Sequence, residues 1–355
     1  MKQVLSVIVM LVGGLSTQAA KIVLVAGGGD GPDGGPATKA KLVTPFGVDF
    51  DSKGRLYFVE MEKGERLRTI EPDGTIKTVA GTGKKGDKGD NGFADVAEFN
   101  GMHGLAISKE GAVFLADTWN NRVRRFDNEG GKIYNFAGTG EKGFAGDGGH
   151  ITTAMFGGTF GICYDKQTRN IYIADLGNAR IRKFNEMELI ISTVAGNGKK
   201  AVPKDGGKAV DEPLLDPRAC AIDTEGNLYI LERGGHSLRV VNKDGIIKTV
   251  MGTGKAGTAV GKALESQMNG PKHLCIDKDN CVIIADAENH RVLRFEPKTN
   301  MVSVVAGTGK RGSDGLDGDP LKCKLNRPHG VTVHPKTGEL YIVDSYNDRI
   351  LKITP

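Results

Sequence analysis

The sequence is poor in cysteine and aromatic residues, with five cysteines and one tryptophan among 355 residues. Five is an odd number, so the cysteines cannot all pair within one chain. Cys163, Cys220 and Cys275 lie in apolar, strand-like stretches, where a thiol packs as a small hydrophobic group. A bridge between Cys275 and Cys281 stays open, because the sequence does not fix the geometry that a disulfide requires.

Several motifs that mark large protein classes are also missing. The chain has no H-E-x-x-H, no G-x-S-x-G between a strand and a helix, and no paired-cysteine metal motif. The pattern G-x-G-x-x-G begins at Gly81, Gly138, Gly252 and Gly307, but none of these opens a long helix in a strand-helix-strand unit, which excludes a dinucleotide site. The formal net charge is only +5, and no basic run with interleaved aromatic residues occurs, so we expect no nucleic-acid partner.

Long apolar runs are absent except at the beginning of the chain. Lys2 is followed by an apolar run from Val4 to Leu15 and by small residues up to Ala20. This pattern is typical of a secretory leader, and the run is too short to span a membrane. We therefore expect a signal peptide over 1–20 and one domain over 21–355, exported to the periplasm or the extracellular space as a monomer without a membrane span.

Glycine is abundant, with 52 residues, and it accompanies an internal repeat. Each copy reads as three or four short strands separated by turns rich in Gly, Asp and Asn. A residue early in the first strand marks the copies, and it is glycine or alanine in five of the six. Its positions are Gly47, Gly104, Gly161, Ala219, His273 and Gly330. An acidic residue ends the second strand of each copy, at Glu60, Asp117, Asp175, Glu232, Asp286 and Asp344. A sixfold array of small sheets follows from this repetition.

The last copy lacks its fourth strand because the sequence ends at Pro355. The stretch from Ile22 to Gly28 has the sequence pattern of a fourth strand, yet no first three strands precede it. We expect this segment to pair into the last copy and close the array into a ring, which removes an exposed sheet edge.

The sequence pattern of the repeat resembles the NHL repeat. The resemblance is clearest in copy three, in Ile173-Ala174-Asp175-Leu176-Gly177-Asn178 with Ala179-Arg180-Ile181, and later in Ser192-Thr193-Val194-Ala195-Gly196. It implies an all-β, six-bladed β-propeller of four-stranded blades. In copies one and four the Asp-x-x-Asn stretch is replaced by Glu60-Met61-Glu62-Lys63 and Glu232-Arg233-Gly234-Gly235, so the roles of those two loops do not follow from the resemblance.

The residues just before the marker positions are the candidates for a functional site, since packing alone does not explain histidine, arginine or lysine at these positions. In chain order they are Phe46, His103, Phe160, Arg218, Lys272 and His329. Antiparallel pairing would put them on the same rim as the ends of the second strands. Copies six, one and two would be neighbours in a closed ring, and they add Glu60, Asp117, Trp119, Asp344 and Tyr346. The sequence therefore predicts a ligand-binding rim around the axis.

Two other interpretations of these residues remain open. The recurring carboxylates, in particular Asp175 and Asp286, can instead hold backbone N–H groups at the strand ends. His103 and His329 could alternatively bind zinc or calcium together with a carboxylate, because imidazole and carboxylate suit such ions. The resemblance extends to the peptidylglycine α-amidating lyases, whose axial histidines hold zinc, and more distantly to lactonase-type propellers. The resemblance to the lyases implies His290 or His236 as a third ligand beside His103 and His329.

The sequence favours a binding module for a peptide, a protein or a glycan at this rim. A metal-dependent lyase or lactonase-type hydrolase, with its site at the end of the central channel, is the alternative. No cofactor is required by the sequence.

Overall fold

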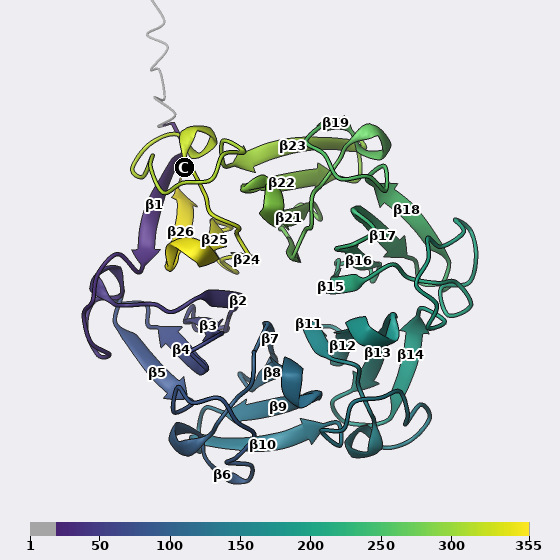
Figure 1. Ribbon diagram of the computed structural model, residues 1–355, viewed down its shortest axis with the longest axis horizontal. Helices are drawn as coiled ribbons and strands as arrows, with labels where there is room; N and C mark the ends of the chain where they lie inside the picture. Colours follow the sequence, from purple (N-terminus) through teal and green to yellow (C-terminus); the bar gives the residue numbers. More distant parts are fainter. Residues whose placement is uncertain (1–18, 355) are drawn as a thin grey trace, which may run out of the picture.

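The computed structural model describes residues 19–354. The chain forms six antiparallel sheets arranged around a central axis (Figure 1). In each sheet the strand nearest the axis is hydrogen-bonded to the second, the second to the third, and the third to the outermost strand. The predicted six-bladed propeller of four-stranded blades is confirmed.

The first three blades follow one another along the chain. Blade 1 consists of β2 (Pro45–Phe50), β3 (Leu56–Glu60), β4 (Arg66–Ile70) and β5 (Ile76–Ala80). Blade 2 consists of β7 (Gly104–Ile107), β8 (Val113–Asp117), β9 (Arg122–Asp127) and β10 (Lys132–Ala137), with the short β6 (Gly92–Phe93) outside β10. Blade 3 consists of β11 (Thr159–Asp165), β12 (Asn170–Asp175), β13 (Arg180–Asn185) and β14 (Ile191–Ala195).

The other three blades complete the circle. Blade 4 consists of β15 (Pro217–Ile222), β16 (Leu228–Glu232), β17 (Ser237–Val241) and β18 (Ile247–Met251). Blade 5 consists of β20 (His273–Ile276), β21 (Val282–Asp286), β22 (Arg291–Glu296) and β23 (Met301–Ala306), with β19 (Gly261–Lys262) outside β23. Blade 6 consists of β24 (Gly330–Val333), β25 (Leu340–Asp344), β26 (Arg349–Thr354) and β1 (Lys21–Ala26).

Blade 6 joins the two ends of the chain. Strand β1 runs antiparallel to β26, with Ile22 opposite Ile353 and Leu24 opposite Leu351. The side chain of Ile22 is completely buried, in a cluster with Val331 and Leu351. The first and the last strand of residues 19–354 thus lie in one sheet, and the outer edge of β26 is paired.

Single turns of 3-10 helix occur at two places in the repeat. The connectors between blades carry η1 (Ala37–Lys39), η2 (Ala94–Val96), η4 (Ile151–Thr153), η6 (Ala263–Glu265) and η8 (Pro320–Lys322). The loops between second and third strands carry η3 (Thr118–Asn120), η5 (Leu176–Asn178), η7 (Ala287–Asn289) and η9 (Ser345–Asn347).

The core consists of layers between neighbouring blades, since each sheet buries both of its faces. Tyr57 and Leu67 of blade 1 pack with Leu115 of blade 2, and Ala174 of blade 3 packs with Ile230 of blade 4. The first strands come very close together around the axis. A Cβ atom on Gly47 would lie 2.7 Å from the Cα of Gly104, which explains why most copies carry glycine at this marker position.

The leader predicted over 1–20 lies outside the described residues, except for Ala19 and Ala20. Within residues 19–354 no helix is long and apolar enough to cross a membrane.

Candidate ligand-binding site at the axis

The six residues predicted from the repeat meet at the end of the propeller where the first strands begin. We call Phe46, His103, Phe160, Arg218, Lys272 and His329 the axial ring. The Phe46 ring lies 4.2 Å from that of His329 and 5.4 Å from that of His103, measured between centroids. His103 lies 4.6 Å from Phe160, and the Arg218 guanidinium carbon lies 4.2 Å from the centroid of Phe160. Side chains from blades 6, 1, 2, 3 and 4 are therefore in continuous contact around the axis.

Two exposed aromatic side chains border this ring. Trp119 in η3 is 52% exposed and lies edge-on to His103, with ring centroids 5.4 Å apart and planes at 88°. Tyr346 in η9 is 43% exposed and lies 5.6 Å from His329. Both follow the acidic end of a second strand, so the local fold of the repeat carries them to the same end of the axis. Large exposed aromatic rings beside buried polar groups are typical of binding surfaces.

Within residues 19–354, both histidines of the ring have one nitrogen in a hydrogen bond and one without a partner. The Nδ1 of His103 lies 2.8 Å from the carbonyl oxygen of Gly101, and that of His329 lies 2.7 Å from the carbonyl oxygen of Arg327. A carbonyl only accepts, so Nδ1 carries the proton in both rings and Nε2 is left as an acceptor. Burial, and then the charge of Arg218, lower the pKa of both imidazoles well below the usual value, so both are neutral at pH 7.

Two cations from blades 4 and 5 complete the ring. Arg218 is only 6% exposed, and among residues 19–354 its guanidinium has no hydrogen-bond acceptor and no carboxylate partner. Burial lowers the pKa of Arg218 to about 9. Lys272 does have a partner, since its Nζ lies 3.3 Å from Glu288, and burial lowers its pKa to about 8. Glu288 also binds Arg327 at 2.5 Å, so this one carboxylate serves two cations.

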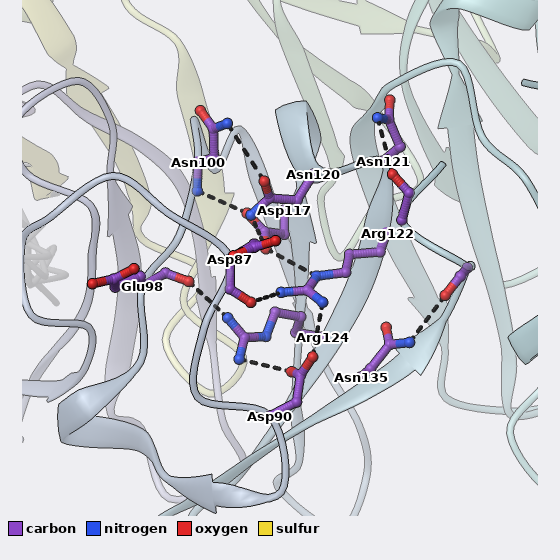
Figure 2. A network of polar contacts seen from close by, with 12 residues as sticks. Asp87, Asp90, Glu98, Asn100, Asp117, Asn120, Asn121, Arg122, Arg124 and Asn135 are labelled. Atoms are coloured by element: carbon purple, nitrogen blue, oxygen red, sulfur yellow. Dashed lines mark hydrogen bonds and ion pairs between the residues drawn. The ribbon is translucent and has the colours of Figure 1, made fainter. Parts of the chain in front are cut away.

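The carboxylates at the ends of the second strands do not face the ligand side. Figure 2 shows the arrangement in blade 2. Asp117 accepts hydrogen bonds from the backbone N–H of Asn100 and from Nδ2 of Asn120, both at 2.9 Å, and from Nε of Arg122 at 3.4 Å. Arg122 in turn binds Asp90 at 2.8 Å. This network fixes the connector from blade 1 to the loop of blade 2.

The same bond to a connector N–H occurs in every blade. The pairs are Val43 with Glu60, Asn100 with Asp117, Gly157 with Asp175, Leu215 with Glu232, Asn269 with Asp286, and Asn326 with Asp344. Each donor stands three residues before a member of the axial ring. Asp175 and Asp286 thus have the backbone-holding role raised as an interpretation of the sequence. Glu60, Asp117 and Asp344, which the sequence places on the binding rim, are buried at 1% exposure or less, and their part in ligand binding stays a prediction.

The residues considered for a metal do not gather as a ligand set. His290 uses its Nδ1 to accept the backbone N–H of Arg327 at 3.1 Å, and His236 accepts that of Gly270 at 3.2 Å. Within residues 19–354 no group of three or more His, Cys, Asp or Glu side chains is placed to hold a metal ion. The free Nε2 atoms of His103 and His329 lie near the charges of Arg218 and Lys272, which disfavour a bound cation. The donor set therefore fits zinc or calcium poorly.

A cavity of about 340 Å³ lies along the axis, toward the far ends of the first strands. Asp49, Cys163, Cys220, His273 and Cys275 are among the residues that line it. The Sγ atoms of Cys163 and Cys220 are 3.6 Å apart, and all five cysteines are free thiols, including Cys275 and Cys281. Sequence reasoning missed this cavity. The available signal was His273, which stands at a marker position where the other copies have glycine or alanine.

Comparisons with known proteins agree with the repeat and with the propeller fold. A model of the NHL repeat matches residues 325–353, and a model of the teneurin NHL domain matches residues 183–259. The chloroplastic protein SUPPRESSOR OF QUENCHING 1 of Arabidopsis thaliana is 26% identical over 76% of this chain and 26% of its own length. Human NHL repeat-containing protein 2 is 24% identical over 80% of this chain and 43% of its own length. The chain thus spans less than half the length of these relatives.

Solved structures show the same fold at low identity. A Bacteroides thetaiotaomicron protein described as an auxiliary nutrient binding protein superimposes with a TM-score of 0.67, at 16% identity, over 94% of this chain and 76% of its own. The repeat matches, the relatives and the six-bladed architecture lead to one conclusion: the chain is an NHL-repeat six-bladed β-propeller.

Proposed function

We propose that this protein is an exported binding module that captures its ligand at the axial ring and the two aromatic side chains beside it. The observation that carries the proposal is the pairing of each exposed aromatic ring, Trp119 or Tyr346, with a neutral imidazole whose Nε2 is free. Apolar faces next to unused hydrogen-bonding atoms are what a specific site requires. The nutrient-binding description of a structural neighbour is consistent with this role.

Trp119 provides the test, because it is the only tryptophan of the chain. Its fluorescence reports directly on binding at this end of the axis. We expect a saturable change on titration with one of three ligand classes, namely peptides, neutral sugars or acidic sugars. Tyr346→Ala should weaken that binding at least tenfold, because it removes an exposed ring that borders the site.

Phe144→Ala is the matched control, since Phe144 is also 43% exposed but packs on Arg180 in a connector. Its effect on affinity should be below twofold. A ligand whose calorimetric affinity is the same for wild type, Trp119→Ala and Tyr346→Ala would bind elsewhere and would overturn the proposal.

A metal-dependent lyase or lactonase-type hydrolase is the second candidate. The two free Nε2 atoms on His103 and His329 are the observation in its favour. It predicts about one zinc or calcium per purified chain and loss of that metal in His103→Ala. Two measurements separate the candidates. Elemental analysis tests for the bound metal, and a chelator tests whether binding depends on it, since the binding proposal predicts unchanged ligand affinity after treatment with a chelator.

Export rests on the sequence of residues 1–20 and has its own test. Expression with the native beginning of the chain should give a mature protein that starts at Ala20 or Lys21, as read by N-terminal sequencing. Retention of Met1 on the recovered protein would contradict export by cleavage.

A further inference from the structure

We propose that the ligand of the axial ring is a sugar acid, that is, a polyhydroxylated molecule with one carboxylate. This inference rests on the proposed function and specifies its ligand. Its carboxylate binds Arg218 with support from Lys272, and its hydroxyl groups donate to Nε2 of His103 and of His329.

The argument begins with the missing partner of Arg218. A buried guanidinium is costly unless an anion or several acceptors satisfy it. Other cations at this end of the axis have such partners, since Arg233 binds Asp216 at 2.7 Å and Arg327 binds Glu288 at 2.5 Å. Among residues 19–354 Arg218 forms no hydrogen bond or ion pair, and its guanidinium packs on the face of Phe160. The charge of Asp216 acts on Arg218, but that carboxylate is already bound by Arg233. Its five N–H donors are therefore available to a ligand.

The planar guanidinium selects the shape of that ligand group. Arginine binds a carboxylate through two parallel hydrogen bonds, which gives both energy and orientation. The positive charge of Lys272, on the adjacent blade 5, acts on the same region, because the charges of Arg218 and Lys272 each lower the pKa of His329. Glu288 neutralises only part of this charge, since it is shared between Lys272 and Arg327. The blade 4 and blade 5 side of the ring thus attracts an anion.

The opposite side of the axial ring, on blades 2 and 6, offers hydrogen-bond acceptors and so favours ligand groups that donate hydrogen bonds. His103 and His329 are neutral and offer Nε2 as an acceptor, on blades 2 and 6. A carboxylate has no proton to give them, so the rest of the ligand must carry O–H groups. Phe46 lies between the two imidazoles on blade 1, which stands opposite blade 4 in the ring (Figure 1). Its ring, with Trp119 and Tyr346, offers apolar faces to the C–H face of a sugar.

Galacturonate and galactose are a matched pair of probes, because they share a hydroxyl pattern and differ in one carboxylate. We expect galacturonate to bind at least tenfold more tightly than galactose, by calorimetry at low salt, and sodium chloride to weaken its binding. Arg218→Gln should remove the preference for the acid. Arg55→Gln is the control and should keep it, since Arg55 is bound to Asp51 in the turn at the other end of the first strand.

Arg218→Lys covers the case in which the glutamine variant does not fold. It retains a positive charge, so it should keep a reduced preference for galacturonate, while its melting temperature reports on the fold. Equal affinities for galacturonate and galactose, or an unchanged preference in Arg218→Gln, would overturn the inference. Tighter binding of glucose 6-phosphate than of galacturonate would also overturn it, in favour of a phosphate ligand.

Failure of this inference is distinguishable from failure of the proposed function. If a neutral sugar or a peptide changes Trp119 fluorescence and galacturonate does not, the site binds a ligand but not a sugar acid. If none of these probes binds, both proposals lose their support.

Discussion

The imidazole of His290 accepts a hydrogen bond of 3.1 Å from the backbone N–H of Arg327, the residue two positions before His329 of the axial ring. His290 closes the loop between the second and third strands of blade 5 in a left-handed conformation, with φ of 51°. Arg327 is also left-handed, with φ of 49°, and it begins the approach to blade 6. One side chain thus links two neighbouring blades at the position that directs His329 to the axis.

The same link recurs at three other blade boundaries. Its side-chain acceptors and N–H donors are Glu65 with Gly101, His236 with Gly270, and Asp348 with Thr44. Each acceptor occupies the equivalent left-handed position of its loop. The residues that set the entrance of a blade into the ring are therefore fixed by the preceding blade.

His290→Ala should lower the free energy of unfolding by about 1 kcal/mol, because the partly buried N–H of Arg327 loses its acceptor. Urea unfolding measures this change. Asn121→Ala is the matched control, since Asn121 occupies the same left-handed position in blade 2 but bonds to Gly140 instead of the next blade. An equal loss in both variants would mean that left-handed strain, and not the link between blades, determines the effect.

Removal of the first strand should destabilise the whole ring. Deleting residues 22–28 eliminates the pairing of β1 with β26 and should lower stability by several kcal/mol, well above about 3 kcal/mol for Ile22→Ala alone. Lys21→Ala, at an exposed position of the same strand, should have little effect. Thermal unfolding unchanged by the deletion would show that the ring does not depend on this seam.

Glu65 predicts a specific dependence of stability on pH. Burial raises the pKa of its carboxyl to about 7, and the charge of Asp117 adds to this, while the Gly101 N–H and Lys85 oppose it. The folded state therefore holds a proton that the unfolded state releases above pH 4.5, so this contribution to stability is full below pH 4.5 and is lost as pH rises toward 7.

Glu65→Gln carries no such penalty and can still accept the Gly101 N–H. We expect it to be more stable than wild type by about 2 kcal/mol at pH 8 and nearly equal at pH 4.5, from urea unfolding at both values. Glu129→Gln, in an exposed turn, is the control for the substitution itself. A constant difference for Glu65→Gln across this range would contradict the raised pKa.

The cysteines predict slow chemical labelling of the native protein. A hydrogen bond to Cys220, together with burial, raises the pKa of the Cys163 thiol well above its usual value, and the thiolate is the reactive form. Iodoacetamide at pH 8 should therefore modify Cys163 slowly until the protein is unfolded. Peptide mapping should also find no bridge between Cys275 and Cys281. Rapid labelling of Cys163 in the native state would contradict its burial.

The sequence predicted the fold and the axial ring because both follow from the repeat. Gly47 and its equivalents mark the place where the first strands meet at the axis. The residue before each marker must therefore lie at the end of the propeller where the first strands begin. The role of Asp117 could not be predicted in the same way. A carboxylate at a strand end has the same sequence pattern whether it faces solvent or accepts a hydrogen bond from a connector N–H. His290 was missed as a link since its partner is a backbone group 37 residues away in the next blade.

The lack of a partner for Arg218 could not be predicted from the sequence, because it depends on every side chain around the axis. One titration tests directly whether Arg218 holds an anionic ligand. Trp119 fluorescence should change and saturate as galacturonate is added to the wild-type protein, and the change should be absent at the same concentrations in folded Arg218→Gln. The same saturable change in both proteins would contradict an anion held by Arg218 at the axial ring.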